Sequence, residues 1–114
     1  MKICVLASGS KGNCTLISSG KTTILIDVGI SYKILKERVE RVGFSVNQIS
    51  AILVTHAHDD HFSGLKVLLK NNRIPLYATE ETASIIDSEF RDYLNKNNDF
   101  HPMGLLIFSK LSHH

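Results

Sequence analysis

The residues with the clearest chemical potential are three histidines and two aspartates in the segment 55–61, which reads T-H-A-H-D-D-H. Imidazole nitrogen and carboxylate oxygen are the ligands of Zn²⁺ and similar divalent metals. His56 and His58 can converge on one metal, while Asp60 and His61 face a second position. Two metals roughly 3.5–4 Å apart are a recurring arrangement in hydrolytic enzymes. The segment therefore predicts a two-metal site, with a histidine-rich polar loop as the alternative.

The position of this segment in the chain supports the metal site. It directly follows the apolar run 51–54 (A-I-L-V), and the small residues Ser63 and Gly64 come shortly after it. A short apolar run that opens into polar residues is typical of a buried strand ending in a loop. Open α/β sheets place their functional sites at the carboxyl ends of their strands.

The part of the chain before this strand predicts three strands and a helix. Residues 2–7, 14–18 and 22–26 are β-prone stretches joined by turns of glycine, serine and asparagine, which predicts an antiparallel meander. Ser31 is a plausible helix N-cap, and Gly43 is a natural stop. The apolar positions of this helix are expected to face the core, and its charged positions to form a solvated face. The apolar set is Ile34, Leu35, Val39 and Val42, and the charged set is Lys33, Lys36, Glu37, Arg38, Glu40 and Arg41.

The remainder alternates between helices and strands. A second helix is expected to begin within 61–63 and to end near 71–72, and a strand follows at 74–78. Thr79 or Glu80 caps a third helix that carries apolar residues as far as Tyr93, and residues 105–108 form a last apolar run. This order predicts an α/β fold with a mixed sheet and covering helices.

Composition narrows the class of protein. The chain has 114 residues, 43% of them hydrophobic and 21% charged, which is typical of one globular domain. A net charge of +2 is too small to indicate nucleic-acid binding by itself. The sequence has no apolar run of about 18 residues, so no membrane partner is expected. Without an export signal, the thiols Cys4 and Cys14 are expected to be reduced, in a cytoplasmic protein.

The motifs also carry a family resemblance. The segment 55–61 resembles the first metal motif of the metallo-β-lactamase superfamily. Residues 6–14 (L-A-S-G-S-K-G-N-C) and 24–29 (I-L-I-D-V-G) make the chain similar to the YycJ/WalJ-like, exodeoxyribonuclease-like branch. The resemblance implies a four-layered αβ/βα sandwich. Residues 1–114 would form the amino-terminal half of it, as a single truncated domain.

The resemblance also implies a ligand set. His56, His58 and His113 would hold the first metal, while Asp60 and His61 would begin the second site. Asp60 is expected to be the catalytic residue as well. The alternative for His113 is a frayed tail or an expression remnant, because it is the penultimate residue.

Asp27 matches an aspartate that lies beneath the metal loop in the superfamily and supports it through hydrogen bonds. A turn or helix-capping aspartate is the alternative for this position. The expected cofactors are two divalent metal ions. Zn²⁺ is favoured, and Mn²⁺ and Fe²⁺ are compatible with the same ligands.

The expected function is metal-dependent hydrolysis of phosphodiesters by a metal-bound hydroxide, with DNA as the substrate. One alternative is a thioester or ester hydrolase of the glyoxalase II kind. Another is a catalytically silent metal-binding fragment, because the bridging aspartate and last histidine of complete members come later than residue 114. The uncovered face of such a half-sandwich is expected to favour self-association.

Overall fold

The computed structural model describes residues 1–9, 12–55, 63–72, 74–79, 81–86, 88 and 105–107. In these residues the chain forms one six-stranded sheet whose strands follow the order of the sequence. The helical elements include α1 (Tyr32–Arg41), the short 3₁₀ helix η1 (Val46–Gln48) and α2 (Ser63–Asn71). The strands are β1 (Lys2–Ala7), β2 (Cys14–Ser19), β3 (Thr22–Ile26), β4 (Ile49–Val54), β5 (Leu76–Ala78) and β6 (Leu105–Ile107).

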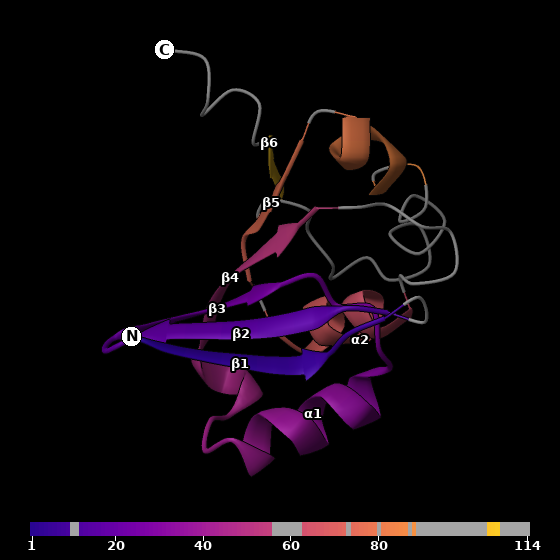
Figure 1. Cartoon of the computed structure of the whole chain (residues 1–114). Helices are drawn as coiled ribbons and strands as arrows, with labels where there is room; N and C mark the ends of the chain where they lie inside the picture. Colours follow the sequence, from indigo (N-terminus) through magenta and orange to yellow (C-terminus); the bar gives the residue numbers. More distant parts are fainter. Residues whose placement is uncertain are drawn as a thin grey trace.

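The sheet is mixed, as predicted (Figure 1). Strands β1, β2 and β3 form an antiparallel meander, and β3, β4, β5 and β6 run parallel to one another. Strand β4 begins two residues before the predicted apolar run. The 3₁₀ helix ahead of it has a capping box, in which Ser45 and Gln48 bond to each other's backbone N–H groups, and this fixes the strand start at Ile49.

Helix α1 has the two ends that the sequence predicts. The Ser31 side chain accepts a hydrogen bond from the N–H of Ile34 at 3.4 Å, as an N-cap residue does. At the other end, Gly43 has φ 93° and donates to the carbonyl of Glu40, while Phe44 donates to the carbonyl of Val39. This pair of bonds is a Schellman motif, which requires the left-handed conformation that glycine adopts readily.

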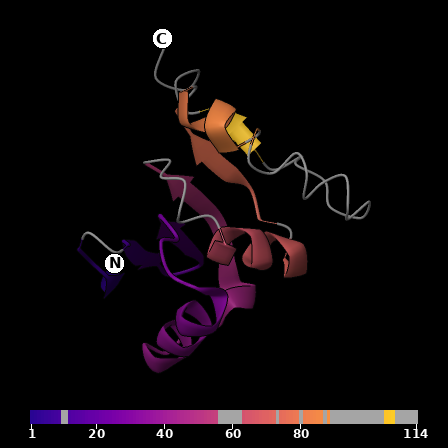
Figure 2. The same cartoon turned by 90° about the vertical axis from the view of Figure 1, so that its right-hand side faces the viewer.

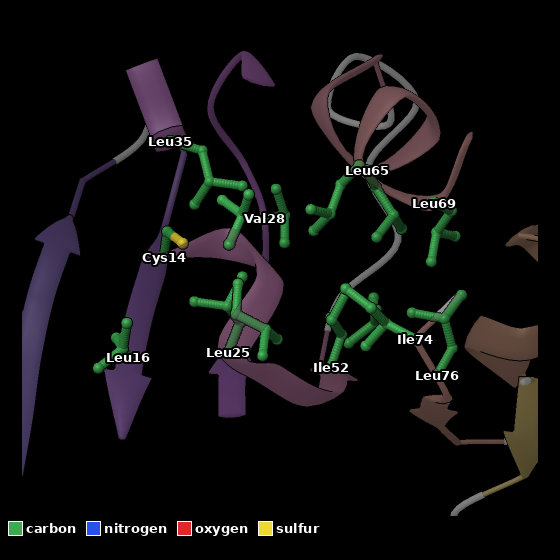
Figure 3. Packing of buried hydrophobic residues seen from close by; sticks show 14 of the residues in the cluster. Cys14, Leu16, Leu25, Val28, Leu35, Ile52, Leu65, Leu69, Ile74 and Leu76 are labelled. Atoms are coloured by element: carbon green, nitrogen blue, oxygen red, sulfur yellow. The ribbon is translucent and has the colours of Figure 1, made fainter. Parts of the chain in front are cut away.

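The core lies between one face of the sheet and the two helices (Figures 2 and 3). Figure 3 shows the side chains of Leu35 in α1 and Leu65 and Leu69 in α2 pointing toward the strands. The strands contribute alternate residues to this layer, because side chains of period two share one face of a sheet. The buried strand residues of the layer include Cys14, Leu16, Leu25, Ile52 and Leu76.

The opposite face of the sheet is also apolar, but it is less covered. Ile3 and Val5 on β1 are 62% and 65% exposed, and Ile17 on β2 lies opposite Ile3. Ile24 and Leu53 are half-buried on β3 and β4. A sheet that is apolar on both faces belongs between two covering layers.

Two apolar residues of the helices are exposed rather than buried in the core. Ile34 is 38% exposed, so the prediction that it faces the core is wrong, whereas Leu35 and Val39 are buried as predicted. Val67, within the second predicted apolar helix, is 40% exposed. Each of these helices packs on the sheet with one side only. The apolar stripe in the sequence is wider than this side, so the residues at its edge are exposed.

The later elements follow the predicted alternation as far as the structure describes them. Helix α2 spans the predicted second helix, and residues 81–86 are helical. Thr79 caps that helix, because its side chain accepts from the N–H of Thr82 and its carbonyl from the N–H of Ala83. The predicted continuation to Tyr93 lies outside the described residues. Among the described helices, none is long and apolar enough to cross a membrane.

Candidate metal centre

The five predicted metal ligands lie outside the described residues, so their roles stay predictions. They are His56, His58, Asp60, His61 and His113. All six histidines of the chain lie outside the described residues. Within the described part of the chain, no three His, Cys, Asp or Glu side chains gather to hold a metal ion. The structure does describe the residues that hold the two ends of the segment 56–62, and these residues form its frame.

The chain enters this segment through Thr55, which is held by Asp27. The Asp27 carboxylate accepts one hydrogen bond from the Thr55 N–H at 2.7 Å and another from the Thr55 hydroxyl at 2.5 Å. Both oxygens of the carboxylate are thus used on one residue, 28 positions further along the chain. Bonds to an ionised acceptor are stronger than neutral ones. Asp27 therefore fixes the direction of the backbone immediately before His56. Its role as a support of metal ligands stays a prediction.

Asp27 can do this because the backbone turns sharply at its position. It follows the last residue of β3 and has φ 63°, a left-handed conformation that aspartate tolerates better than most residues. Its N–H still donates to the carbonyl of Leu53 at 2.7 Å, so the residue remains attached to β4. The side chain is then directed at the residue that follows β4 rather than continuing the sheet alternation.

The chain leaves the segment through α2, which is packed on the same loop. A Cβ atom added to Gly64 would lie 2.0 Å from the carbonyl oxygen of Ile30. The first turn of α2 therefore touches the backbone just before α1, and only a glycine fits there. The segment 56–62 is thus framed at both ends by one short stretch of chain, residues 27–30.

The turn between β1 and β2 packs on this same stretch. Gly29 donates to the carbonyl of Asn13 at 2.9 Å, and a Cβ atom on Gly12 would lie 2.2 Å from the carbonyl oxygen of Gly29. Gly9 donates to the Asn13 side chain at 3.2 Å, which closes the turn on itself. The predicted turn at 8–13 is therefore a structural support of the loop that carries Asp27.

A buried thiol and a guanidinium lie behind this frame. Burial raises the pKa of Cys14 to about 12, the nearby Asp27 carboxylate adds to the rise, and the Arg38 guanidinium opposes it. Arg38 donates from Nη1 to the carbonyl of Leu6 at 2.5 Å. The expectation that Arg38 belongs to the solvated face of α1 is therefore wrong. The sequence did contain a signal for this placement, because Arg38 comes three residues after buried Leu35 and therefore lies on the same side of the helix.

Both cysteines, which lie in the described part of the chain, are free thiols. Cys14 is fully buried between β2 and the helices and is protonated at neutral pH, so it belongs to the core. This agrees with the expected reduced state.

The arrangement fits a metal centre chemically. A histidine- and aspartate-rich segment follows a parallel strand, and its two ends are fixed by a carboxylate and by direct backbone contact. Fixed ligand orientation is what outer hydrogen bonds provide in metal sites. Such a frame fixes the two ends of the segment that carries the imidazole and carboxylate groups.

The sequence profile of the metallo-beta-lactamase superfamily matches residues 7–100. The chain therefore belongs to the metallo-beta-lactamase superfamily, as the resemblance of its motifs predicted. Membership implies divalent metal binding. The described sheet and helices form half of the αβ/βα sandwich of this fold.

Among curated relatives, the chain is similar to exodeoxyribonuclease YycJ of Bacillus anthracis, with 41% identity over 78 residues. This match covers 68% of the chain and 30% of the relative. Exodeoxyribonuclease WalJ of Streptococcus pneumoniae serotype 2 is 35% identical over 95 residues, covering 83% of the chain and 35% of the relative. The predicted YycJ/WalJ-like branch is confirmed by these similarities. The chain spans about a third of the length of the relatives that it matches.

The fold is shared with solved metallo-β-lactamases. The native FEZ-1 metallo-beta-lactamase of Legionella gormanii superposes with a TM-score of 0.65 at 19% identity. The superposition covers 87% of this chain and 39% of that one. At this identity the match shows the fold alone.

Proposed function

We propose that this chain carries the amino-terminal part of a metal-dependent nuclease that hydrolyses phosphodiester bonds of DNA. The observation that supports this most directly is the 41% identity to the exodeoxyribonuclease YycJ, over a stretch of 78 residues. The frame of Asp27, Thr55 and Gly64 around the histidine-rich segment supplies the structural basis for a metal site.

In this proposal His56, His58 and His113 hold one divalent ion, and Asp60 and His61 begin the site of another. When bound, the ions lower the pKa of a water molecule and polarise the phosphate that it attacks. Asp27 keeps the Thr55 backbone in one orientation, so that the ligands that follow start from a fixed point. Asp60 is placed in the catalytic role. Zn²⁺ is the first candidate metal, and cytoplasmic location is part of the same proposal.

A silent metal-binding fragment is the second candidate, and the coverage of the relatives favours it. The chain spans only 30% and 35% of YycJ and WalJ. In this alternative, the ligands that complete the second site belong to a part of the family fold that the chain does not match. A chain that holds the first metal and lacks the second would bind nucleic acid or metal without turnover.

The test combines metal content with a nuclease assay on the purified chain, loaded with Zn²⁺ or Mn²⁺. The expected result is about two metals per chain and metal-dependent shortening of end-labelled double-stranded DNA. Both are expected to be lost in the variant H58A/D60A. A thioester substrate assayed with the same preparation tests the glyoxalase II-like alternative. About one metal per chain and no hydrolysis of either substrate would favour the silent fragment.

A further inference from the structure

Strand β1 ends in a β-bulge next to the turn that supports the metal frame. Val5 pairs with Thr15 and Ala7 pairs with Cys14, so Leu6 is the extra residue on the β1 side. A bulge bends its strand and turns one peptide group away from the ladder. The bulge therefore decides the direction in which the chain leaves β1 and enters the turn at residues 8–13.

Arg38 binds the peptide group of the bulge. Its guanidinium donates from α1 to the carbonyl of Leu6, across 32 positions of sequence, at 2.5 Å. Leu6 is 6% exposed and Arg38 is half-buried, so this charge-assisted bond is shielded from water. Figure 1 shows α1 running alongside the sheet at β1, which brings the side chain within reach.

A continuous set of contacts leads from this bond to the metal loop. The turn that begins after the bulge is closed by the bond from Gly12 to the carbonyl of Gly9. It is then tied to Gly29 by the bond to the carbonyl of Asn13 and by the close approach of Gly12. Gly29 lies two residues after Asp27, and the Asp27 carboxylate holds the Thr55 backbone. Each link is a hydrogen bond, a close backbone contact or a step of two residues along the chain, so little slack separates the ends.

We propose that Arg38 is a positioning residue of the metal centre. It fixes the bulge at Leu6, and through the turn that packs on Gly29 it fixes the loop that presents Asp27 to Thr55. The part of this inference that concerns metal affinity rests on the proposed function. The part that concerns the frame does not depend on any metal.

Amide hydrogen exchange measured by NMR on the metal-free chain tests the frame directly. The variant Arg38→Gln keeps a polar side chain, but it is shorter and lacks the charge and the fork of donors. We expect the amides of Gly29 and Thr55 to exchange at least about tenfold faster in this variant, because a bond to a charged donor is lost. The amide of Val39, which follows Arg38 in α1, is expected to keep its exchange rate.

Two further variants control the experiment. Arg41→Gln removes an exposed charge from the last turn of the same helix, and no change is expected at Gly29 or Thr55. Arg38→Lys keeps the charge with a single donor group and is expected to restore part of the protection. If Arg38→Gln fails to fold, Arg38→Lys against wild type gives the same comparison.

Metal affinity is the second readout. Zn²⁺ binding measured by competition with a chelator is expected to weaken about 10–100-fold in Arg38→Gln. Unchanged exchange at Gly29 and Thr55, or a proportional increase at every amide including Val39, would overturn the positioning role. A wild-type chain that binds no Zn²⁺ would instead contradict the proposed function, while the exchange rates still decide the role of Arg38.

Discussion

The Asp27 carboxylate links the end of β3 to Thr55, which follows β4. A substitution of this side chain is therefore expected to disturb the frame. Asn can adopt the same left-handed backbone, so Asp27→Asn changes the side chain without disturbing the turn. Its Oδ1 atom can still accept from the Thr55 N–H, whereas Asp27→Ala removes both bonds. We expect Zn²⁺ affinity to fall about 10–100-fold in Asp27→Ala, and less in Asp27→Asn.

A double-mutant cycle separates this effect from a general loss of stability. Thr55→Val removes only the hydroxyl that donates to Asp27. If the two side chains act through each other, the combined variant Asp27→Asn with Thr55→Val is expected to show coupling of about 0.5–3 kcal/mol. The measurement is the free energy of denaturant unfolding, together with the Zn²⁺ dissociation constant. Strict additivity would contradict the role given to this contact.

Cys14 gives a prediction about pH, with a definite sign. Its pKa is raised from 9.0 to about 12 in the folded chain, so the folded state keeps a proton that the unfolded state releases. The contribution of this group to stability is therefore complete below about pH 9 and is lost as the pH rises toward 12. At about pH 8 the thiolate is about a thousandfold scarcer than in the unfolded chain.

Iodoacetamide labelling of a Cys4→Ser variant measures this, because Cys14 is then the remaining thiol. The native chain is expected to react at least about a hundredfold more slowly than the same chain in denaturant. Equal rates in the two conditions would mean that the thiol is accessible and ionised in the native state. The free energy of unfolding, followed from about pH 8 to about pH 11, is expected to decrease.

At the scale of elements, the start of α2 is set by close contact with the loop before α1. Replacing a glycine inside a helix by alanine ordinarily stabilises the helix by about 1 kcal/mol. At Gly64 the sign is reversed, because the new Cβ atom would meet the carbonyl oxygen of Ile30 at 2.0 Å. We expect Gly64→Ala to destabilise the chain by roughly 1–3 kcal/mol, the range for overpacking.

Lys70→Ala serves as the matched control, since Lys70 is exposed in the last turn of the same helix. It is expected to change the unfolding free energy by about 0.5 kcal/mol or less. The midpoint and slope of urea unfolding provide the comparison. An unchanged or higher midpoint in Gly64→Ala would show that α2 can shift away from Ile30 at little cost.

At the scale of the whole molecule, the sheet has two apolar faces and one described layer of helices. The second face carries Ile3, Val5, Ile17 and Leu53, and the first two of these are more than half exposed. In an αβ/βα sandwich that face is covered by the other half of the fold. We expect the chain by itself to associate with a second copy through this face, because exposed apolar area of this kind favours association.

The variant I3K/V5K tests this prediction, with Ile34→Lys on the outer side of α1 as its control. Sedimentation velocity over a series of concentrations is expected to show association in the wild-type chain and in the control. Association is expected to be weakened or absent in I3K/V5K, because each lysine must desolvate to be buried. A wild-type chain that remains monomeric across the series would contradict the prediction.

The sequence by itself determined the elements and the family. The apolar runs that form β1 to β4, the Ser31 cap and the Gly43 stop are local signals, and the structure bears them out. Local signals are reliable here because strand alternation and helix capping depend on residues that are only a few positions apart in the sequence. The histidine-rich segment indicated the superfamily for a related reason, since its histidines and aspartates lie within seven consecutive residues, 55–61.

Only the tertiary structure decided which residues frame the site. The contacts of Thr55 with Asp27, of Gly64 with Ile30 and of Arg38 with Leu6 each join positions far apart in sequence. A sequence pattern shows that a glycine is small or that an arginine is charged, but the backbone oxygen it meets depends on how the elements pack. For this reason Arg38 was expected in solvent, and the packing of α1 against a bulged strand placed it beneath the frame of the metal loop instead.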